Sequence, residues 1–218
     1  MEPPLTLQTQ LEQLWLKQKP FVAFCLPQSN EVQLYFQQDN TLHKTTRLND
    51  SGFALAPFDP ETPTFFIPNT LQKSFPIAKA QQQFPSEIPL AETQQEKTAF
   101  VQLIQKAVHT ISSGSFKKLV VSRKIEHQTS KSPVVVFMDL LRAYNGTMVY
   151  LWSHPKGGCW LGASPEKFLK KMEEGVQTEA LAGTQVYHSS KKIVWKQKEI
   201  DEQELVAEQI RQDLKPFF

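Results

Sequence analysis

Residues 158–184 of this 218-residue chain read GCWLGASPEKFLKKMEEGVQTEALAGT. Three short runs in this stretch have the composition of strands bounded by turn-forming residues. They are residues 159–161, 168–172 and 176–182. Residues 173–175 are expected to form the hairpin turn between the last two strands. Consecutive strands joined by hairpins favour an α+β fold over an alternation of strands and helices.

Outward from this stretch, apolar residues at helical spacing predict helices at residues 5–16, 92–112, 132–144 and 201–214. Strand-like runs occur at residues 21–26, 32–37, 52–58, 64–67, 118–125 and 147–153. The first part of the chain holds most of the 15 prolines, and the pattern changes near Glu92. We therefore expect a variable N-terminal sheet region at residues 1–91 and a second region at residues 92–218.

The bulk properties exclude several classes of protein. A net charge of +2 with 21% charged residues implies no nucleic acid or other polyanion as a partner. The N-terminus lacks the order of a signal peptide, and no apolar run approaches the ~20 residues of a membrane span. Cys25 and Cys159 show no metal-ligand spacing, so they are expected to be free buried thiols in a cytoplasmic protein.

Two features of residues 158–184 could serve a binding site. Glu166 is a single carboxylate among small residues and a proline at a strand end, where a carboxylate is more often a turn or cap residue than a catalyst. Ala182, Gly183 and Thr184 are expected to end the last strand with backbone N–H groups that could receive an anionic ligand. Neither feature is specific by itself.

The neighbouring motifs add specificity. FxKxVxSR occupies residues 116–123, GASPE residues 162–166, LAGT residues 181–184 and KExxEQ residues 198–203. In this order and spacing the motifs resemble the chorismate-utilising enzymes, and the isochorismate synthases most closely, over residues 92–214. The resemblance implies the ADC synthase-like fold, with antiparallel-rich sheet layers and helices packed on one side, and with residues 92–218 forming the first part of a chorismate-binding catalytic core.

The resemblance also implies roles for individual residues. Lys118 matches the lysine that activates water, and Glu166 matches the acid that protonates the departing 4-hydroxyl of chorismate. Glu202 matches a glutamate that binds Mg²⁺, with Glu199 close by. From the residues alone, Lys118 could equally be a solvated lysine. Glu199 and Glu202, three apart on one helix face, could equally belong to a solvated acidic face.

Two positions bear on the reaction. Relatives that deliver ammonia to chorismate have glutamine in place of Lys118, and aminodeoxychorismate synthases tend to have a lysine nucleophile in place of Ala182. Both positions point to water as the nucleophile, and so to an isochorismate synthase of menaquinone or siderophore biosynthesis. A salicylate synthase shares Lys118 and Glu166 and stays an alternative. An aminating, anthranilate-type enzyme is disfavoured by Lys118. A non-catalytic fragment that binds a ligand or partner is a further alternative.

The resemblance leaves part of the family pattern unmatched. Gln203 stands where the family often has histidine, a change not expected to abolish metal binding. The family's chains are much longer, so residues 1–218 are expected to be a truncated form, inactive or nearly so alone. Truncation is also expected to leave an open sheet edge that invites self-association.

Overall fold

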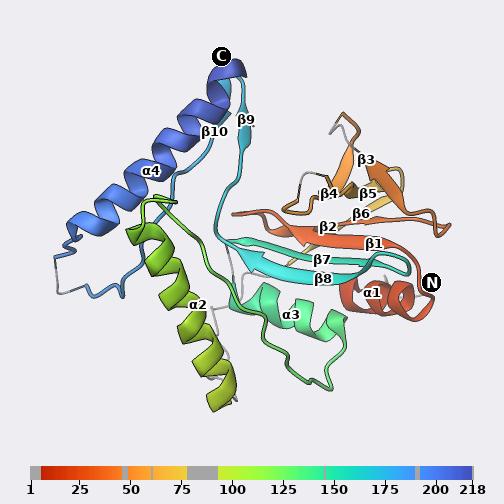
Figure 1. Ribbon diagram of the computed structural model, residues 1–218. Coiled ribbons are helices and arrows are strands. Elements are labelled where there is room, and N and C mark those ends of the chain that lie inside the picture. Colours follow the sequence, from red (N-terminus) through yellow and green to blue (C-terminus); the bar gives the residue numbers. More distant parts are fainter. Residues whose placement is uncertain are drawn as a thin grey trace, which may run out of the picture. The chain divides into compact units, whose positions relative to one another are not determined.

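The computed structural model describes residues 6–45, 49–59, 61–77, 93–144, 146–189 and 192–217. The chain forms two compact units (Figure 1). The first unit comprises Met1–Ile88 and Gln128–Glu166, and the second comprises Pro89–His127 and Lys167–Phe218. Residues 128–166 therefore pack with the N-terminal sheet region. The expected boundary near Glu92 lies outside the described residues.

The first unit is built on a five-stranded antiparallel sheet with the strand order β6-β2-β1-β7-β8. The strands are β1 (Phe21–Cys25), β2 (Glu31–Phe36), β6 (Gln72–Pro76), β7 (Met148–His154) and β8 (Gly158–Ser164). The predicted pairing of residues 21–26 with residues 32–37 is confirmed, and β7 pairs with the other side of β1. A segment late in the sequence thus completes a sheet begun by the N-terminal strands.

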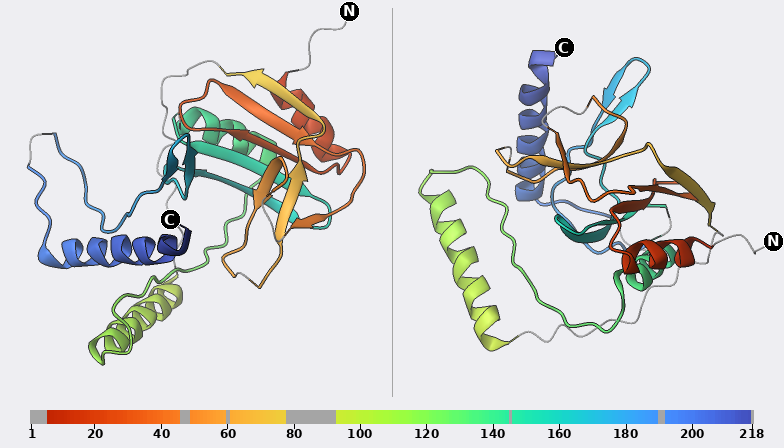
Figure 2. Two further views of the ribbon diagram at one scale, coloured as in Figure 1. Left: turned by 90° about the horizontal axis from the view of Figure 1, so that it is seen from above. Right: turned by 90° about the vertical axis from the view of Figure 1, so that its right-hand side faces the viewer.

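A second, three-stranded sheet has the order β3-β5-β4, formed by β3 (His43–Thr45), β4 (Gly52–Leu55) and β5 (Thr64–Pro68). It covers one face of the large sheet, and α1 (Leu7–Leu16) and α3 (Pro133–Ala143) cover the other face (Figure 2). The alternation along β1 explains this arrangement. Phe21, Ala23 and Cys25 pack with the helices, whereas Val22 and Phe24 pack with the small sheet.

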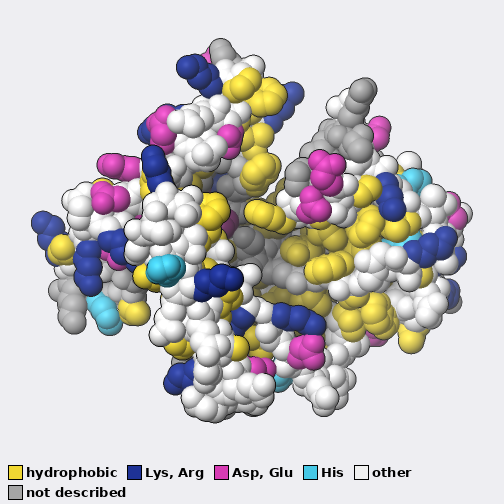
Figure 3. All heavy atoms as spheres, viewed as in Figure 1, with side chains coloured by type: hydrophobic (Ala, Val, Ile, Leu, Met, Phe, Trp, Pro, Cys, Tyr) yellow, Lys and Arg dark blue, Asp and Glu magenta, His cyan; other side chains and the backbone are white. Residues whose placement is uncertain are grey.

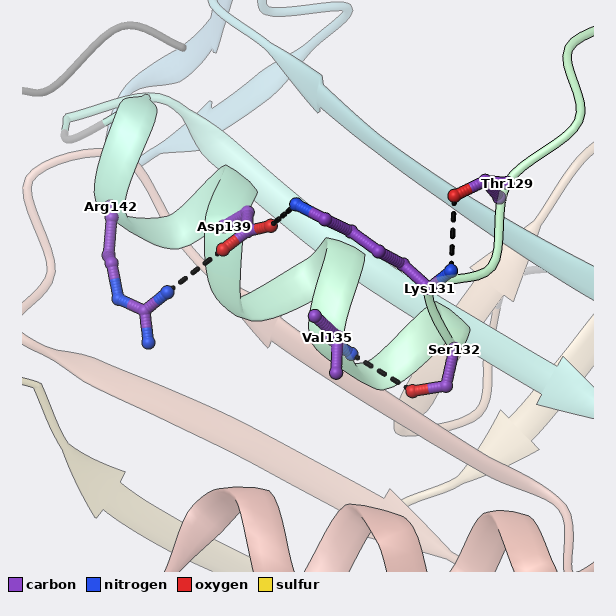
Figure 4. A network of polar contacts seen from close by, with 6 residues as sticks. All are labelled: Thr129, Lys131, Ser132, Val135, Asp139 and Arg142. Atoms are coloured by element: carbon purple, nitrogen blue, oxygen red, sulfur yellow. Dashed lines mark hydrogen bonds and ion pairs between the residues drawn. The ribbon is translucent and has the colours of Figure 1, made fainter.

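The start of α3 follows from its local sequence (Figure 4). The Ser132 hydroxyl accepts a hydrogen bond from the Val135 N–H at 3.3 Å, and Pro133 occupies the first turn, as predicted. Asp139 pairs with Lys131 Nζ at 2.6 Å and with Arg142 at 2.9 Å on the outer face. The apolar face of the helix is thereby left for the core, where Phe137 is fully buried.

The second unit contains α2 (Gln94–Ser112), the hairpin of β9 (Lys170–Met172) and β10 (Gly175–Gln177), α4 (Gln197–Leu214) and the short 3-10 turn η1 (Lys215–Phe217). Helix α2 begins with a capping box between Thr93 and Glu96, which lowers the pKa of the Glu96 carboxyl through hydrogen bonds from Thr93. All residues of α2 and α4 are described, and none of them is buried. Hydrophobic side chains remain exposed on the hairpin, at Met172 and Val176, and on η1, at Phe217. Figure 3 shows hydrophobic side chains at the surface of this unit.

Three expectations about local structure are wrong. Residues 118–125 form no strand, because no neighbouring strand in the described chain supplies a hydrogen-bonding ladder to them. The strand expected at residues 176–182 ends at Gln177 for the same reason. Cys25 is buried, but Cys159 is exposed, because it lies on the edge strand β8. The remaining predicted helices and strands are present with shifted ends, and the α+β fold with antiparallel sheets is confirmed.

None of the helices in the described part of the chain combines the length and the apolar character that a membrane span requires.

Candidate active site

Lys118 reaches α4 through an ion pair. Its Nζ lies 3.2 Å from Glu202 Oε1, and the two side chains are 26% and 32% exposed. The adjacent Lys117 is exposed. The two lysines are therefore not an equivalent solvated pair. A side-chain contact, rather than a strand ladder, places Lys118 beside the helix that also bears Glu199.

Glu199 lies three residues before Glu202 in α4, so both carboxylates occupy neighbouring positions on one side of the helix. Its Oε2 atom is buried and has no hydrogen-bond partner among the described residues. A buried carboxylate oxygen without a partner is unfavourable, and a cation or a donor in that position would relieve the cost. Glu199 and Glu202 therefore do not belong to a fully solvated acidic face of α4.

This carboxylate pair fits Mg²⁺ as a partial ligand set. Magnesium prefers oxygen ligands and keeps several waters, so one or two protein carboxylates suffice beside a substrate oxygen. Within the described ranges, no group of three or more His, Cys, Asp or Glu side chains is arranged to hold a metal ion. Waters and substrate would have to supply the other ligands.

The segment with Ala182, Gly183 and Thr184 lies along the same helix. Gly183 has a φ of +67°, and a Cβ added there would lie 3.3 Å from Glu199 Cγ. Gln203 Nε2 donates a hydrogen bond of 3.3 Å to the carbonyl oxygen of Ala180. Ala182 is half-buried, whereas Gly183 and Thr184 are exposed. Residues 182–184 were expected to end a strand, and they do not. Their backbone nevertheless lies close to the acidic side chains of α4.

Glu166 belongs to the first unit, whereas the other predicted site residues belong to the second. It is exposed just beyond β8, and its backbone N–H donates a 3.2 Å hydrogen bond to the Ser164 hydroxyl. That bond closes the expected turn around Pro165 and orders the backbone without engaging the carboxylate. Glu179, to which the sequence assigned no catalytic role, pairs with Lys167 at 2.8 Å.

Two contacts of the second unit were not anticipated. The Gln203–Ala180 hydrogen bond could have been suspected, because Gln203 lies four residues after Glu199 and so faces the same side of α4. The guanidinium of Arg123 lies over the Phe100 ring, 5.2 Å from its centroid. No local pattern indicated this second contact, which joins the Lys118 segment to α2.

Comparison with known proteins identifies the family. The family profile described as "Chorismate binding enzyme" matches residues 61–218. The chain belongs to this family. The resemblance inferred from the four motifs is therefore confirmed for the family, and the match begins well before residue 92. The small sheet's strand β5 and the edge strand β6 both fall within the matched part of this chorismate binding enzyme.

One curated relative gives a more specific similarity. Over 91 residues the chain is 33% identical to the isochorismate synthase MenF of Escherichia coli (strain K12), which is 41% of this chain and 21% of that protein. The alignment thus spans about a fifth of the relative's length. No solved structure gives a significant match.

Proposed function

We propose that this chorismate binding enzyme converts chorismate to isochorismate, by adding water at C2 and releasing the C4 hydroxyl. The observation that supports the proposal best is that Lys118 contacts Glu202 of α4 and that the backbone at Gly183 lies against Glu199 of the same helix. The similarity to MenF supports the choice of reaction. Isochorismate formed in this way would enter menaquinone or siderophore biosynthesis.

Lys118 is proposed as the general base. Its amine takes a proton from the water that attacks C2, and the new C2–O bond shifts the ring double bonds towards C4. An amine is suited to this step, whereas the side-chain amide of a glutamine has no comparable basicity. The ion pair with Glu202 places the Lys118 ammonium beside the acidic side chains. Lys118 can act as the base only after this ammonium has released one proton, because only the neutral amine can accept one.

Glu166 is proposed as the general acid. Its protonated carboxyl transfers a proton to the C4 oxygen as the C4–O bond breaks, so that the hydroxyl leaves as water. No proton or electron is gained or lost overall, because the base removes one proton and the acid supplies one. The turn at Pro165 leaves the carboxylate exposed for this role.

Glu202 and Glu199 are proposed to hold Mg²⁺, with the unpartnered Glu199 oxygen as the feature that favours a cation. Bound there, the ion would supply electrostatic stabilisation of the substrate carboxylate and of the charge that develops on it. The backbone of Ala182, Gly183 and Thr184 is proposed to receive an anionic group of the substrate.

The test is a product assay. The purified chain is mixed with chorismate and Mg²⁺, products are separated by liquid chromatography, and chorismate binding is measured by calorimetry. We expect little or no isochorismate from this chain alone, so chorismate binding is the first readout. Any rate that is measured is expected to fall at least about a hundredfold for Lys118→Ala, as for removal of a general base. Lys117→Ala is the matched control and is expected to retain the rate, because Lys117 is exposed.

Other products would select other functions. Salicylate together with pyruvate would indicate a salicylate synthase, which shares Lys118 and Glu166. Chorismate binding without any product would support a non-catalytic fragment that binds its ligand without turnover. Absence of both binding and product from folded protein would reject the proposal for this chain.

A further inference from the structure

The segment from Ala180 to Thr184 owes its position to α4 rather than to a sheet. Strand β10 ends at Gln177, and residues 178–188 have no regular secondary structure. Two contacts with α4 are defined. The Gln203 amide bonds to the Ala180 carbonyl, and the backbone of Gly183 lies against the Glu199 side chain.

The spacing of these contacts matches one helical turn. Glu199 and Gln203 are four residues apart in α4 and therefore lie one above the other on the same side of the helix. Their partners Ala180 and Gly183 are three residues apart in an irregular segment. The segment is thus held at two points along the helix, with one polar bond and one close packing contact.

Glutamine suits this position chemically. Its amide donates a hydrogen bond without a net charge, so it adds no charge beside Glu199 and Glu202. Only the Gln203 contact is directional, because the contact at Gly183 is packing alone. The ion pair of Glu179 with Lys167 joins the preceding residues to the hairpin side rather than to α4, so without the Gln203 bond only packing at Gly183 would keep residues 180–182 beside the helix.

We propose that Gln203 is a positioning residue: it holds the Ala180 carbonyl so that the backbone of Gly183 and Thr184 stays beside the two glutamates of α4. The use of this backbone for the substrate's anionic group rests on the proposed function. The positioning of the segment by Gln203 does not depend on it.

Nuclear magnetic resonance relaxation of the full chain tests the positioning directly. In the Gln203→Ala variant, the backbone order parameters of residues 180–184 are expected to fall from the rigid range, about 0.85, towards the flexible range below about 0.6. Gln209→Ala is the matched control, because Gln209 is also in α4 but bonds to Asp213 within the helix, at 2.8 Å. The control is expected to leave the order parameters of residues 180–184 unchanged.

A second variant separates hydrogen bonding from packing. Gln203→Glu keeps the size of the side chain but removes the donor at neutral pH, so it is expected to mobilise residues 180–184 as Gln203→Ala does. A variant that retained rigid residues 180–184 without the donor would show that Gln203 acts through packing, and would overturn the proposal.

Chorismate affinity tests whether the positioning of residues 180–184 affects substrate binding. One hydrogen bond contributes about 1 kcal/mol, so Gln203→Ala is expected to raise the chorismate Kd about fivefold, and Gln209→Ala to leave it unchanged. Unchanged order parameters or an unchanged Kd in Gln203→Ala would each overturn the positioning role. If the wild-type chain binds no chorismate, the proposed function fails, and the order parameters alone decide the role of Gln203.

Discussion

The two units of this protein are stabilised in different ways. Among the described residues, every buried hydrophobic side chain belongs to the first unit, where the large sheet is covered on both faces. In the second unit, neither α2 nor α4 has a buried residue, and the defined links between segments include an ion pair, a side-chain hydrogen bond and a cation–π contact.

The difference separates the packed scaffold of the first unit from the candidate site residues of the second. Burial of large side chains contributes several kcal/mol per residue and specifies one packed arrangement, as in the first unit. Partly exposed polar contacts contribute about 1 kcal/mol or less each. Most candidate site residues therefore lie where single contacts can be removed without unfolding the protein.

The largest effect is expected in the first unit's core. Phe137 of α3 is fully buried, so Phe137→Ala is expected to lower the free energy of unfolding by about 3–5 kcal/mol, through lost burial and a residual cavity. Phe168 in the second unit is 94% exposed, and Phe168→Ala is expected to stay within about 0.5 kcal/mol. Urea unfolding followed by circular dichroism measures both. Equal effects would contradict the contrast between the units.

A smaller effect is expected from two glycines of the second unit. Gly183 and Gly114 have φ angles of +67° and +80°, so alanine at either position is expected to cost about 1 kcal/mol of backbone strain. Only at Gly183 would the new Cβ meet other atoms, those of Glu199 and Trp195, because nothing lies within 4 Å at Gly114.

Gly183→Ala is therefore expected to reduce chorismate affinity well beyond Gly114→Ala, while the two variants unfold at similar urea concentrations. Calorimetric titration with chorismate, beside urea unfolding, makes the comparison. Equal affinities for the two variants would show that the close approach of Gly183 to α4 has no part in binding.

A pH effect is expected in the first unit. His154 is buried, and desolvation lowers the pKa of its imidazole below the ordinary value of 6.5. Its Nδ1 accepts the Lys156 N–H at 3.0 Å, so its Nε2 donates to the Thr41 carbonyl. The folded protein is therefore stabilised by the neutral form of the His154 imidazole.

Because the folded pKa is the lower one, the unfolded chain binds the proton first as the pH falls. His154 therefore supports stability above about pH 6.5, and this support is lost as the pH drops through that value towards the folded pKa. Urea midpoints at several pH values, for the wild type and for His154→Gln, measure the effect. A wild-type midpoint that falls no more than that of the variant would contradict the assignment.

The smallest effect is expected for the Lys118–Glu202 ion pair. Its side chains are partly exposed, so the pair is expected to contribute less than about 1 kcal/mol to stability, and less at high salt. A double-mutant cycle with Lys118→Met and Glu202→Gln, unfolded in urea at low and high sodium chloride, measures the coupling. A coupling above about 2 kcal/mol would show that the second unit depends on this pair for its fold.

Sequence reasoning succeeded where the signal is local. The cap of α3 at Ser132 and Pro133 and the helical spacing of α2 depend on residues within one or two turns. The motifs at residues 116–123 and 198–203 likewise indicated the family before any contact was known. The helix positions of Glu199 and Glu202 followed from their spacing alone.

Sequence reasoning failed where a partner distant in the chain decides the outcome. Residues 118–125 alternate as a strand does, but a strand requires a neighbour to bond with, and none pairs with them in the described chain. Cys159 was expected to be a buried thiol because it has no metal-ligand spacing, but it is exposed, on a strand at the sheet edge. In both cases the missing information was the identity of the neighbouring segment.

The family, the helices and the residue types available for chemistry can be read from the chain alone, because motifs and periodicity are properties of short stretches. Three features required the folded structure: β7 completes the N-terminal sheet, Glu202 pairs with Lys118, and Gln203 bonds to Ala180. These contacts join residues 23 to 132 positions apart along the chain. Such pairings depend on how whole elements pack, whereas a local pattern shows at most which face of its own helix or strand a residue occupies.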